Sequence, residues 1–159
     1  MKAHEMMKNQ VVKVKEQDCV YEGIKKMLKY NISGLPVVND RNEITAFLSD
    51  EDIIAAIGKQ NEIVLGTLFY ADVFKINPKG FKERAQEILT LNVMEIAPKK
   101  VFTVKWDENV ENIAAAMAKK KIKQLPVVRN GVLVGIISRS DVIRSAFQSI
   151  NECLTKSVC

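Results

Sequence analysis

Apolar and polar positions along the chain follow the same order twice. In each copy, a short apolar run leads into a stretch with apolar residues at helical spacing. Two apolar runs separated by a polar turn follow, and then a second amphipathic stretch. Residues 32–38 read ISGLPVV and residues 122–128 read IKQLPVV. Such duplication predicts two pseudo-symmetric units with a corresponding pair of clefts.

Each copy predicts a strand, a helix, two strands and a final helix, in that order. The first copy places strands at 11–14, 35–38 and 44–48 and helices at 20–28 and 50–57. The second places strands at 101–104, 125–128 and 132–137 and helices from 110 and from 140. Asp18 stands where a helix N-cap is useful, and Gly58 is expected to end its helix.

The chain therefore divides into four parts: a first unit at 1–58, an insert at 59–92, a second unit at 93–150 and a tail at 151–159. Because a small sheet leaves an apolar face uncovered, we expect an α/β (α+β) fold with the units packed sheet to sheet. In the insert, 68–74 is compatible with a helix, 77–80 is a break and an amphipathic helix begins at 81. The insert is either a helical connector over the pair or a lid or partner-docking element.

Composition indicates a folded, cytoplasmic protein. The chain has 159 residues, of which 47% are hydrophobic. None of its apolar runs reaches the roughly 18 residues of a membrane span, and its first residues lack the apolar core of a signal peptide. The net charge of +5 is dispersed. Its densest run, Lys119–Lys121, suits a helix end. Nucleic-acid binding is thus disfavoured, while a phosphorylated small ligand fits.

The chain offers little material for catalysis. Its three cysteines, Cys19, Cys153 and Cys159, are an odd number without CxxC spacing, which disfavours a disulfide framework or a zinc site. A single histidine leaves little for a Ser-His-Asp triad. A glycine-rich phosphate-binding loop is also missing from the sequence. We therefore expect no enzyme, no metal and no cofactor.

The two copies resemble a tandem pair of cystathionine β-synthase (CBS) domains, a Bateman module. The shared marks are h-x-x-h-P-V-V, the hairpin after it, and Ser-x-x-Asp at 49–52 and 138–141. Gly135 matches the family's glycine before the final strand ends, where the first copy has Ala46. Val93-Met94 resembles the Val-Met pair that often precedes a unit, and Met6-Met7 is a looser version. The resemblance covers all but the insert and the tail.

The resemblance implies a regulatory module that binds an adenine nucleotide (AMP, ADP or ATP) or another adenosyl compound between its units. It also implies a flat, two-fold symmetric homodimer. A ligand that contacts both units favours one relative orientation, so binding can control a client protein. The alternative is a protein-interaction module with vestigial clefts that docks through the insert or the tail.

Ser-x-x-Asp has a structural and a functional interpretation. A serine just before a helix can cap it, and an aspartate three residues later can reciprocate. A carboxylate also offers two acceptor oxygens to the neighbouring hydroxyls of a ribose, and a helix N-terminus attracts phosphate. Both interpretations remain open from the sequence.

By the resemblance, the first cleft pairs Asp141, the ribose ligand, with Ser138 and Arg139 on the phosphate side. The planar guanidinium of Arg139 can bind phosphate bidentately, although an ordinary exposed arginine is the alternative. The opposite wall comes from the other copy: Val11, Ile32, Ser33 and Pro36. Val11 and Ile32 could equally be plain core.

The second cleft is the pseudo-symmetric counterpart and consists of Ser49, Asp52, Val101, Ile122, Lys123 and Pro126. Here Asp50 and Glu51 replace Arg139 and Ser140. Added carboxylates oppose anion binding, and Lys123 offsets one of them. We therefore predict unequal clefts. The Arg139 cleft prefers nucleotides, and the Glu51 cleft is empty, weaker or suited to a less anionic adenosyl ligand.

Overall fold

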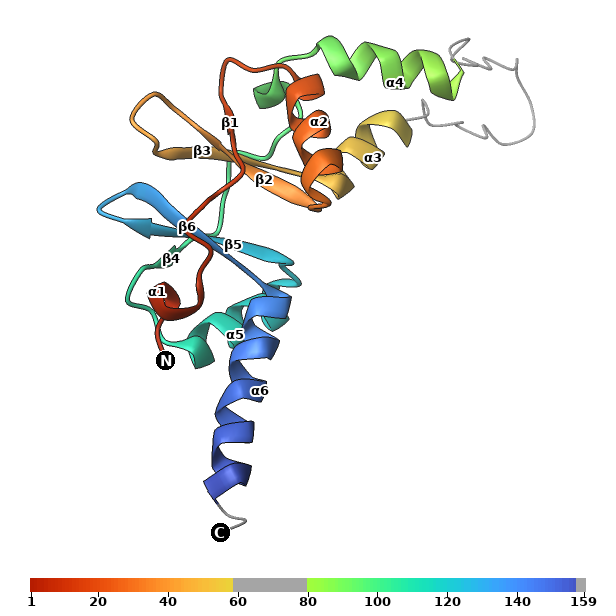
Figure 1. Cartoon of the computed structure of the whole chain (residues 1–159). Helices are drawn as coiled ribbons and strands as arrows, with labels where there is room; N and C mark the ends of the chain where they lie inside the picture. Colours follow the sequence, from red (N-terminus) through yellow and green to blue (C-terminus); the bar gives the residue numbers. More distant parts are fainter. Residues whose placement is uncertain (59–79, 157–159) are drawn as a thin grey trace, which may run out of the picture.

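The computed structural model describes residues 1–58 and 80–156, without the side chains of 149 and 151–156. The insert helix considered at 68–74 and most of the break at 77–80 lie outside these residues. Two three-stranded sheets with flanking helices make up the described part (Figure 1).

The first unit contains β1 (Val14–Lys15), α2 (Val20–Tyr30), β2 (Gly34–Val38), β3 (Ile44–Ser49) and α3 (Asp50–Gly58). Strand β2 lies at the centre of its sheet, parallel to β1 and antiparallel to β3. All five residues of β2 are buried, which explains why it reads as a continuous apolar run.

The second unit repeats the arrangement with β4 (Val104–Lys105), α5 (Val110–Lys120), β5 (Gln124–Arg129), β6 (Val132–Ser138) and α6 (Arg139–Lys156). Its strands pair in the same order and directions. The predicted succession of strand, helix, two strands and helix is therefore confirmed in both units. Three further elements are α1 (Ala3–Met6), α4 (Phe81–Thr90) and the 3₁₀ helix η1 (Val93–Glu95).

Local details differ from the sequence prediction. Strands β1 and β4 begin at Val14 and Val104, because ladder pairing with the central strand starts only there. Asp18 does not cap α2, whose N-cap is Cys19. Its carboxylate instead accepts a hydrogen bond from the amide of Lys15 at 2.8 Å. Helix α6 continues to Lys156, into the segment expected to be a tail.

The segment leading into each unit packs against the other unit. The amide of Ala3 donates to a carbonyl of the second unit at 2.8 Å, and the amide of Val93 donates to one of the first at 2.9 Å. Ala3 thus occupies the place in one repeat that Val93 has in the other. The looser match proposed for Met6-Met7 is therefore wrong, because these residues lie three positions further along.

The two hairpins meet where the units face each other, with their turns side by side at the left of Figure 1. Glu43 and Val132 form an antiparallel bridge. The side-chain amide of Asn42 donates to the carbonyl of Leu133 at 2.9 Å, and the amide of Leu133 donates back to the carbonyl of Asn42 at 3.0 Å. These reciprocal bonds fix the two sheets against each other and leave the helices outside.

Helix α4 packs on the first unit. Ile88 is buried in that unit's core, and Nε of Arg84 donates to the carbonyl of Ile57, the penultimate residue of α3, at 2.8 Å. Residues 81–90 therefore cover part of the first unit. Among the described helices, none is long and apolar enough to cross a membrane.

Candidate functional site

The Ser-x-x-Asp motifs form the predicted capping boxes. The amide and hydroxyl of Ser49 donate to Oδ2 of Asp52 at 2.9 and 2.6 Å, and the amide of Asp52 lies 3.3 Å from the Ser49 hydroxyl oxygen. Ser138 and Asp141 repeat this with distances of 2.9, 2.5 and 3.4 Å. The two motifs therefore start α3 and α6 with nearly identical geometry.

The other carboxylate oxygen distinguishes the two aspartates. Oδ1 of Asp141 lies 3.4 Å from Arg144 and 3.7 Å from Lys8, and the side chain is only 4% exposed. Oδ1 of Asp52 accepts no hydrogen bond from the described residues. Asp52 therefore keeps an acceptor available for a ligand, whereas Asp141 already has two cations beside it.

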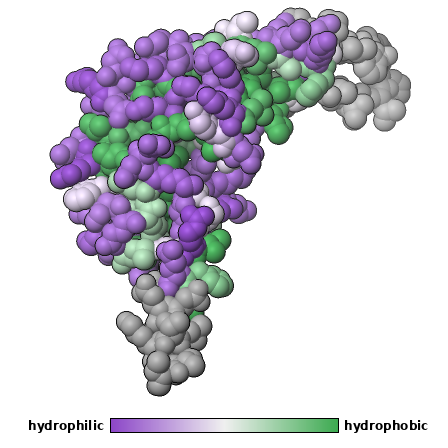
Figure 2. Space-filling view, in the orientation of Figure 1, coloured by the Kyte–Doolittle hydropathy of each residue, from purple (hydrophilic) through white to green (hydrophobic). Residues whose placement is uncertain are grey.

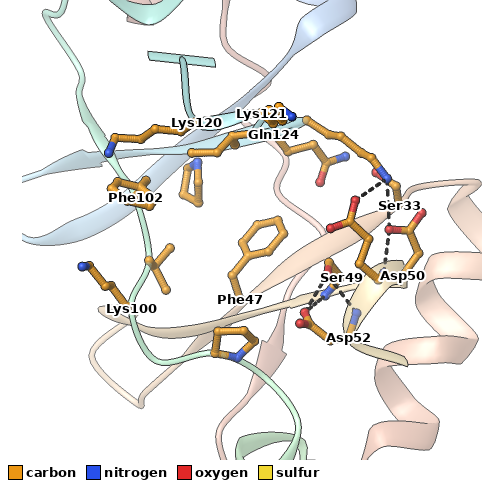
Figure 3. Close-up of a pocket in the computed structure, with 16 residues that line it drawn as sticks. Ser33, Phe47, Ser49, Asp50, Asp52, Lys100, Phe102, Lys120, Lys121 and Gln124 are labelled. Carbon is orange, nitrogen blue, oxygen red and sulfur yellow. Dashed lines mark hydrogen bonds and ion pairs between the residues drawn. The ribbon is translucent and has the colours of Figure 1, made fainter. Parts of the chain in front are cut away.

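A cavity of about 250 Å³ lies beside Asp52, between the two units (Figure 3). One wall comes from the end of β3 and the start of α3. The other comes from residues 98–102, the end of α5 and the start of β5. All six residues predicted for the second cleft line it: Ser49, Asp52, Val101, Ile122, Lys123 and Pro126.

Lys123 bridges the two carboxylates that distinguish this cleft. Its Nζ lies 3.1 Å from Glu51 and 3.3 Å from Asp50. These neighbours, Glu51 most strongly and then Asp50, raise the pKa of the Lys123 ammonium above its usual value. Lys123 thus contacts both carboxylates and offsets one of their two negative charges, which weakens the repulsion expected for an anionic ligand.

Three further lysines border the cavity and were missed by the sequence comparison: Lys100, Lys120 and Lys121. None of the three forms an ion pair with a described carboxylate. Nζ of Lys120 lies 4.0 Å from the centre of the Phe102 ring. Helix α5 does end at Lys120, as expected, but this end faces the cleft. An alignment of the two repeats could have singled out these three lysines. The equivalent positions of the first copy, 10, 30 and 31, carry uncharged residues.

The residues predicted for the first cleft are not gathered in the same way. Nε of Arg139 donates to the carbonyl of Ile122, within its own unit, at 2.9 Å. Pro36 is fully buried, and Val11 and Ile32 are half-buried. Ser33 borders the Asp52 cavity. A second cavity lies between α2 and α3, and neither of these two cavities is lined by Asp141, Ser138 or Arg139.

Comparison with known proteins points to one family. A family model for the CBS domain matches residues 3–59 and 93–147. The protein MJ1426 of Methanocaldococcus jannaschii is 30% identical over 151 residues, which cover 89% of this chain and 88% of that protein.

Solved structures share the fold. The crystal structure of CBSX2 in complex with AMP aligns with a TM-score of 0.70 at 21% identity, covering 92% of this chain and 96% of that one. The CBS domain pair of MJ0100, in complex with 5′-methylthioadenosine and S-adenosyl-L-methionine, aligns with a TM-score of 0.69 at 22% identity. It covers 94% of this chain and 98% of that one. The predicted fold class is therefore confirmed.

Proposed function

The chain belongs to the CBS domain family, and we propose that it is a regulatory module that binds an adenine nucleotide or another adenosyl compound between its two units. The observation that carries this proposal is the cavity beside Asp52, to which both units contribute. The complexes of CBSX2 with AMP and of MJ0100 with adenosyl compounds support it by analogy. In this proposal the chain senses its ligand and catalyses no reaction.

The cavity offers the right chemistry for such a ligand. Oδ1 of Asp52 is available to accept hydrogen bonds from ribose hydroxyls. Val101 and Ile122 supply apolar surface for the faces of a purine. Four lysines against three carboxylates line the walls, so an anionic group is tolerated.

We rank the two clefts differently from the sequence comparison. The sequence favours the Arg139 cleft when residues 49–52 are compared with residues 138–141 and Lys123 is taken to offset one carboxylate. That comparison left out Lys100, Lys120 and Lys121, and it could not show that Lys8 and Arg144 pair with Asp141. We therefore propose the Asp52 cleft as the principal site and the Arg139 cleft as the secondary one.

In this proposal, ligand binding changes the relative orientation of the two units. Because the walls of the cavity come from both, a bound ligand stabilises the orientation in which it contacts both walls. The hairpin contact between Asn42 and Leu133 is a natural pivot for such a change. The proposed output is a change in the surface that a client protein recognises.

A thermal-shift panel tests the ligand class. We expect AMP, ADP, ATP or S-adenosylmethionine to stabilise the protein by about 2.7 kcal/mol at a hundredfold excess over Kd. For a chain of this size that corresponds to a rise in Tm of roughly 5–10 °C. Cytidine monophosphate serves as a control with the same phosphate and a different base. A folded protein that responds to none of the adenosyl compounds at millimolar concentration would contradict the proposal, and a co-purifying protein would then favour the interaction module.

The proposed partner in assembly is a second copy of the chain. Apolar side chains stand exposed on the outer helices: Leu28 on α2 is 78% exposed, Ile54 on α3 is 69% exposed, and Ile143 and Phe147 on α6 are each 62% exposed. Leu28 and Ile54 border the cavity between α2 and α3. Hydrophobic surface over the helices of the first unit is visible at the upper right of Figure 2. Large apolar side chains gathered on an exposed face, as Leu28 and Ile54 are, are typical of an interface.

Charges introduced into this face should separate the dimer. In the double variant Leu28→Asp with Ile54→Asp, two carboxylates would have to be buried without partners, at a cost of several kcal/mol. We expect light scattering coupled to size-exclusion chromatography to report a dimer for the wild type and a monomer for the variant. Lys29→Asp, on the same helix but about 100° around from Leu28, is the control and should stay dimeric. A double variant with wild-type mass would rule out this interface.

A further inference from the structure

We infer that the relative position of the two units depends on the charge of the ligand in the Asp52 cleft. Opposite charges on the two walls hold the units together, and the phosphates of a bound nucleotide separate them. This inference rests on the proposed function and names the way in which the ligand acts on the two units.

The two walls of the cavity carry opposite charges. Every lysine that lines it belongs to the second unit, and every carboxylate that lines it belongs to the first. The lysines are Lys100, Lys120, Lys121 and Lys123, and the carboxylates are Asp50, Glu51 and Asp52. Figure 3 shows Lys120 and Lys121 across the cavity from Asp52. Opposite charges closer than the Debye length, about 10 Å at 0.1 M salt, attract each other. This arrangement therefore draws the two units together.

Lys123 turns this attraction into a direct contact between the units. Its Nζ lies 3.1 Å from a carboxylate oxygen of Glu51 and 3.3 Å from one of Asp50. All three side chains are partly or largely exposed to solvent. Exposed ion pairs are individually weak and are screened by salt, so the charge of a ligand can compete with these pairs.

The Lys123 ion pairs lie at the opposite end of the hairpins from the contact between the turns. Strand β3 begins beside Glu43, which forms a bridge with Val132, and it ends beside Asp50. In the second unit, β6 begins at Val132 and β5 begins directly after Lys123. Six strand residues span about 20 Å. A small rotation about the turns therefore separates Lys123 from Asp50 and keeps the bridge between the hairpins.

Phosphate reverses the interaction between the walls. One phosphate group on the lysines adds a charge of about −1.5 to −2 at pH 7. Each further phosphate cancels more of the lysine charge, so ATP has a larger effect than AMP. Once Lys123 pairs with phosphate, the carboxylates of Asp50 and Glu51 face a negative group and repel it. Adenosine, which is uncharged, leaves the attraction between the walls in place.

The equivalent residues of the other cleft do not carry these opposite charges. The amide of Asp50 donates to the carbonyl of Ser33 at 2.8 Å, and the amide of Arg139 donates to that of Lys123 at 3.2 Å. Arg139 is therefore equivalent to Asp50, and Ser33 is equivalent to Lys123. Nε of Arg139 donates instead to the carbonyl of Ile122 in its own unit. The response to ligand charge is thus confined to the Asp52 cleft.

A distance between spin labels on the two units tests this inference. Lys29→Cys on α2 and Lys119→Cys on α5 place the labels at equivalent, exposed positions near the ends of these helices. The three native cysteines are replaced by serine, and dilution with unlabelled protein removes distances between copies. With each ligand at a saturating concentration set by calorimetry, we expect no change with adenosine, a longer distance with AMP and the longest with ATP. A shift on the order of 5 Å takes Lys123 and Asp50 out of direct contact and toward the Debye length.

Two measurements without ligand test the ion pairs alone. At 1 M NaCl the Debye length falls to about 3 Å, so the distance between the labels should increase. Lys123→Ala should lengthen it at low salt. Lys99→Ala is the control, because Lys99 is exposed and does not line the cavity, and it should behave as the wild type does.

The variant Asp50→Asn with Glu51→Gln removes the carboxylates that face the phosphates. We expect it to bind ATP more tightly than the wild type and to show no change in distance when it does. A shift with ATP in this variant, equal shifts with adenosine and ATP in the wild type, or no shift with bound ATP would overturn the inference and leave adenosyl binding intact. Failure to bind any adenosyl compound, with the salt-dependent shift present, would contradict the proposed function and keep the Lys123 contact. Melting curves establish that each variant is folded.

Discussion

Replacing Asp52 by alanine should weaken binding of the adenosyl ligand about a hundredfold, because it removes charged acceptors whose hydrogen bonds are worth roughly 1.5–3 kcal/mol each. Oδ2 of Asp52 is shared with Ser49, but Oδ1 accepts no hydrogen bond from the described residues. The ribose hydroxyls would therefore lose their acceptor. Isothermal titration with the best ligand from the thermal-shift panel measures the change in Kd.

Asp52 also caps the start of helix α3, so the effect of losing this cap on folding stability needs a separate control. Alanine at this position should cost about 1 kcal/mol of folding stability through the lost cap. Asp52→Asn retains a side-chain oxygen for the Ser49 amide but removes the charge. We expect this variant to recover most of the melting temperature and little of the affinity. Recovery of both would mean that Asp52 acts only through the helix.

Asp141→Ala is the matched variant in the other cleft. Its Oδ1 is already beside Arg144 and Lys8, so we expect a much smaller change in Kd than for Asp52→Ala. The reverse order, with Asp141→Ala abolishing binding and Asp52→Ala tolerated, would restore the ranking that the sequence comparison favoured. The pair of variants therefore decides which cleft is the principal site.

The repeat made much of the architecture predictable. The family resemblance is confirmed, and the hairpins, the amphipathic helices and both capping boxes lie where periodicity and turn residues place them. Within each unit these features depend on neighbours close in sequence, such as Ser49 and Asp52. The predicted capping role of Asp18 was wrong because its carboxylate can accept a hydrogen bond either from the first turn of α2 or from the turn before it. In the structure it accepts from the amide of Lys15 and does not cap α2.

The charge of the site was less predictable, because it depends on which segments the two units bring together. The positions of Lys100, Lys120 and Lys121 at one cavity follow from the packing of the units and not from any local pattern. The pairing of Lys8 with Asp141 spans nearly the whole chain. Composition could indicate a phosphorylated ligand, but only the fold shows that the lysines border the Asp52 cleft.

The glycine that distinguishes the two repeats has a packing reason of its own. Gly135 is opposite Val127 and Ala46 is opposite Val37, so the two positions are equivalent. A Cβ on Gly135 would lie 2.8 Å from Cγ of Met7. The equivalent of Met7 in the other repeat is Ala97, a small residue buried in the same core as Ala46. A large residue thus faces glycine in one unit, and alanine faces alanine in the other.

Gly135→Ala should therefore destabilise the protein by about 1–3 kcal/mol, the usual cost of overpacking, and Met7→Ala should suppress most of that loss. Because the two side chains would share one space, their effects on the free energy of unfolding should be non-additive, with a coupling of about 1 kcal/mol or more. Urea denaturation of the wild type, both single variants and the double variant measures this coupling. Ala46→Gly with Ala97→Gly is the control cycle, since no overlap exists there to relieve, and it should be nearly additive. Additive effects of Gly135→Ala and Met7→Ala would show that the leading segment moves freely away from β6. Lys8 follows Met7 in this segment, so it could not then stay paired with Asp141. The ranking of the two clefts depends on that pairing.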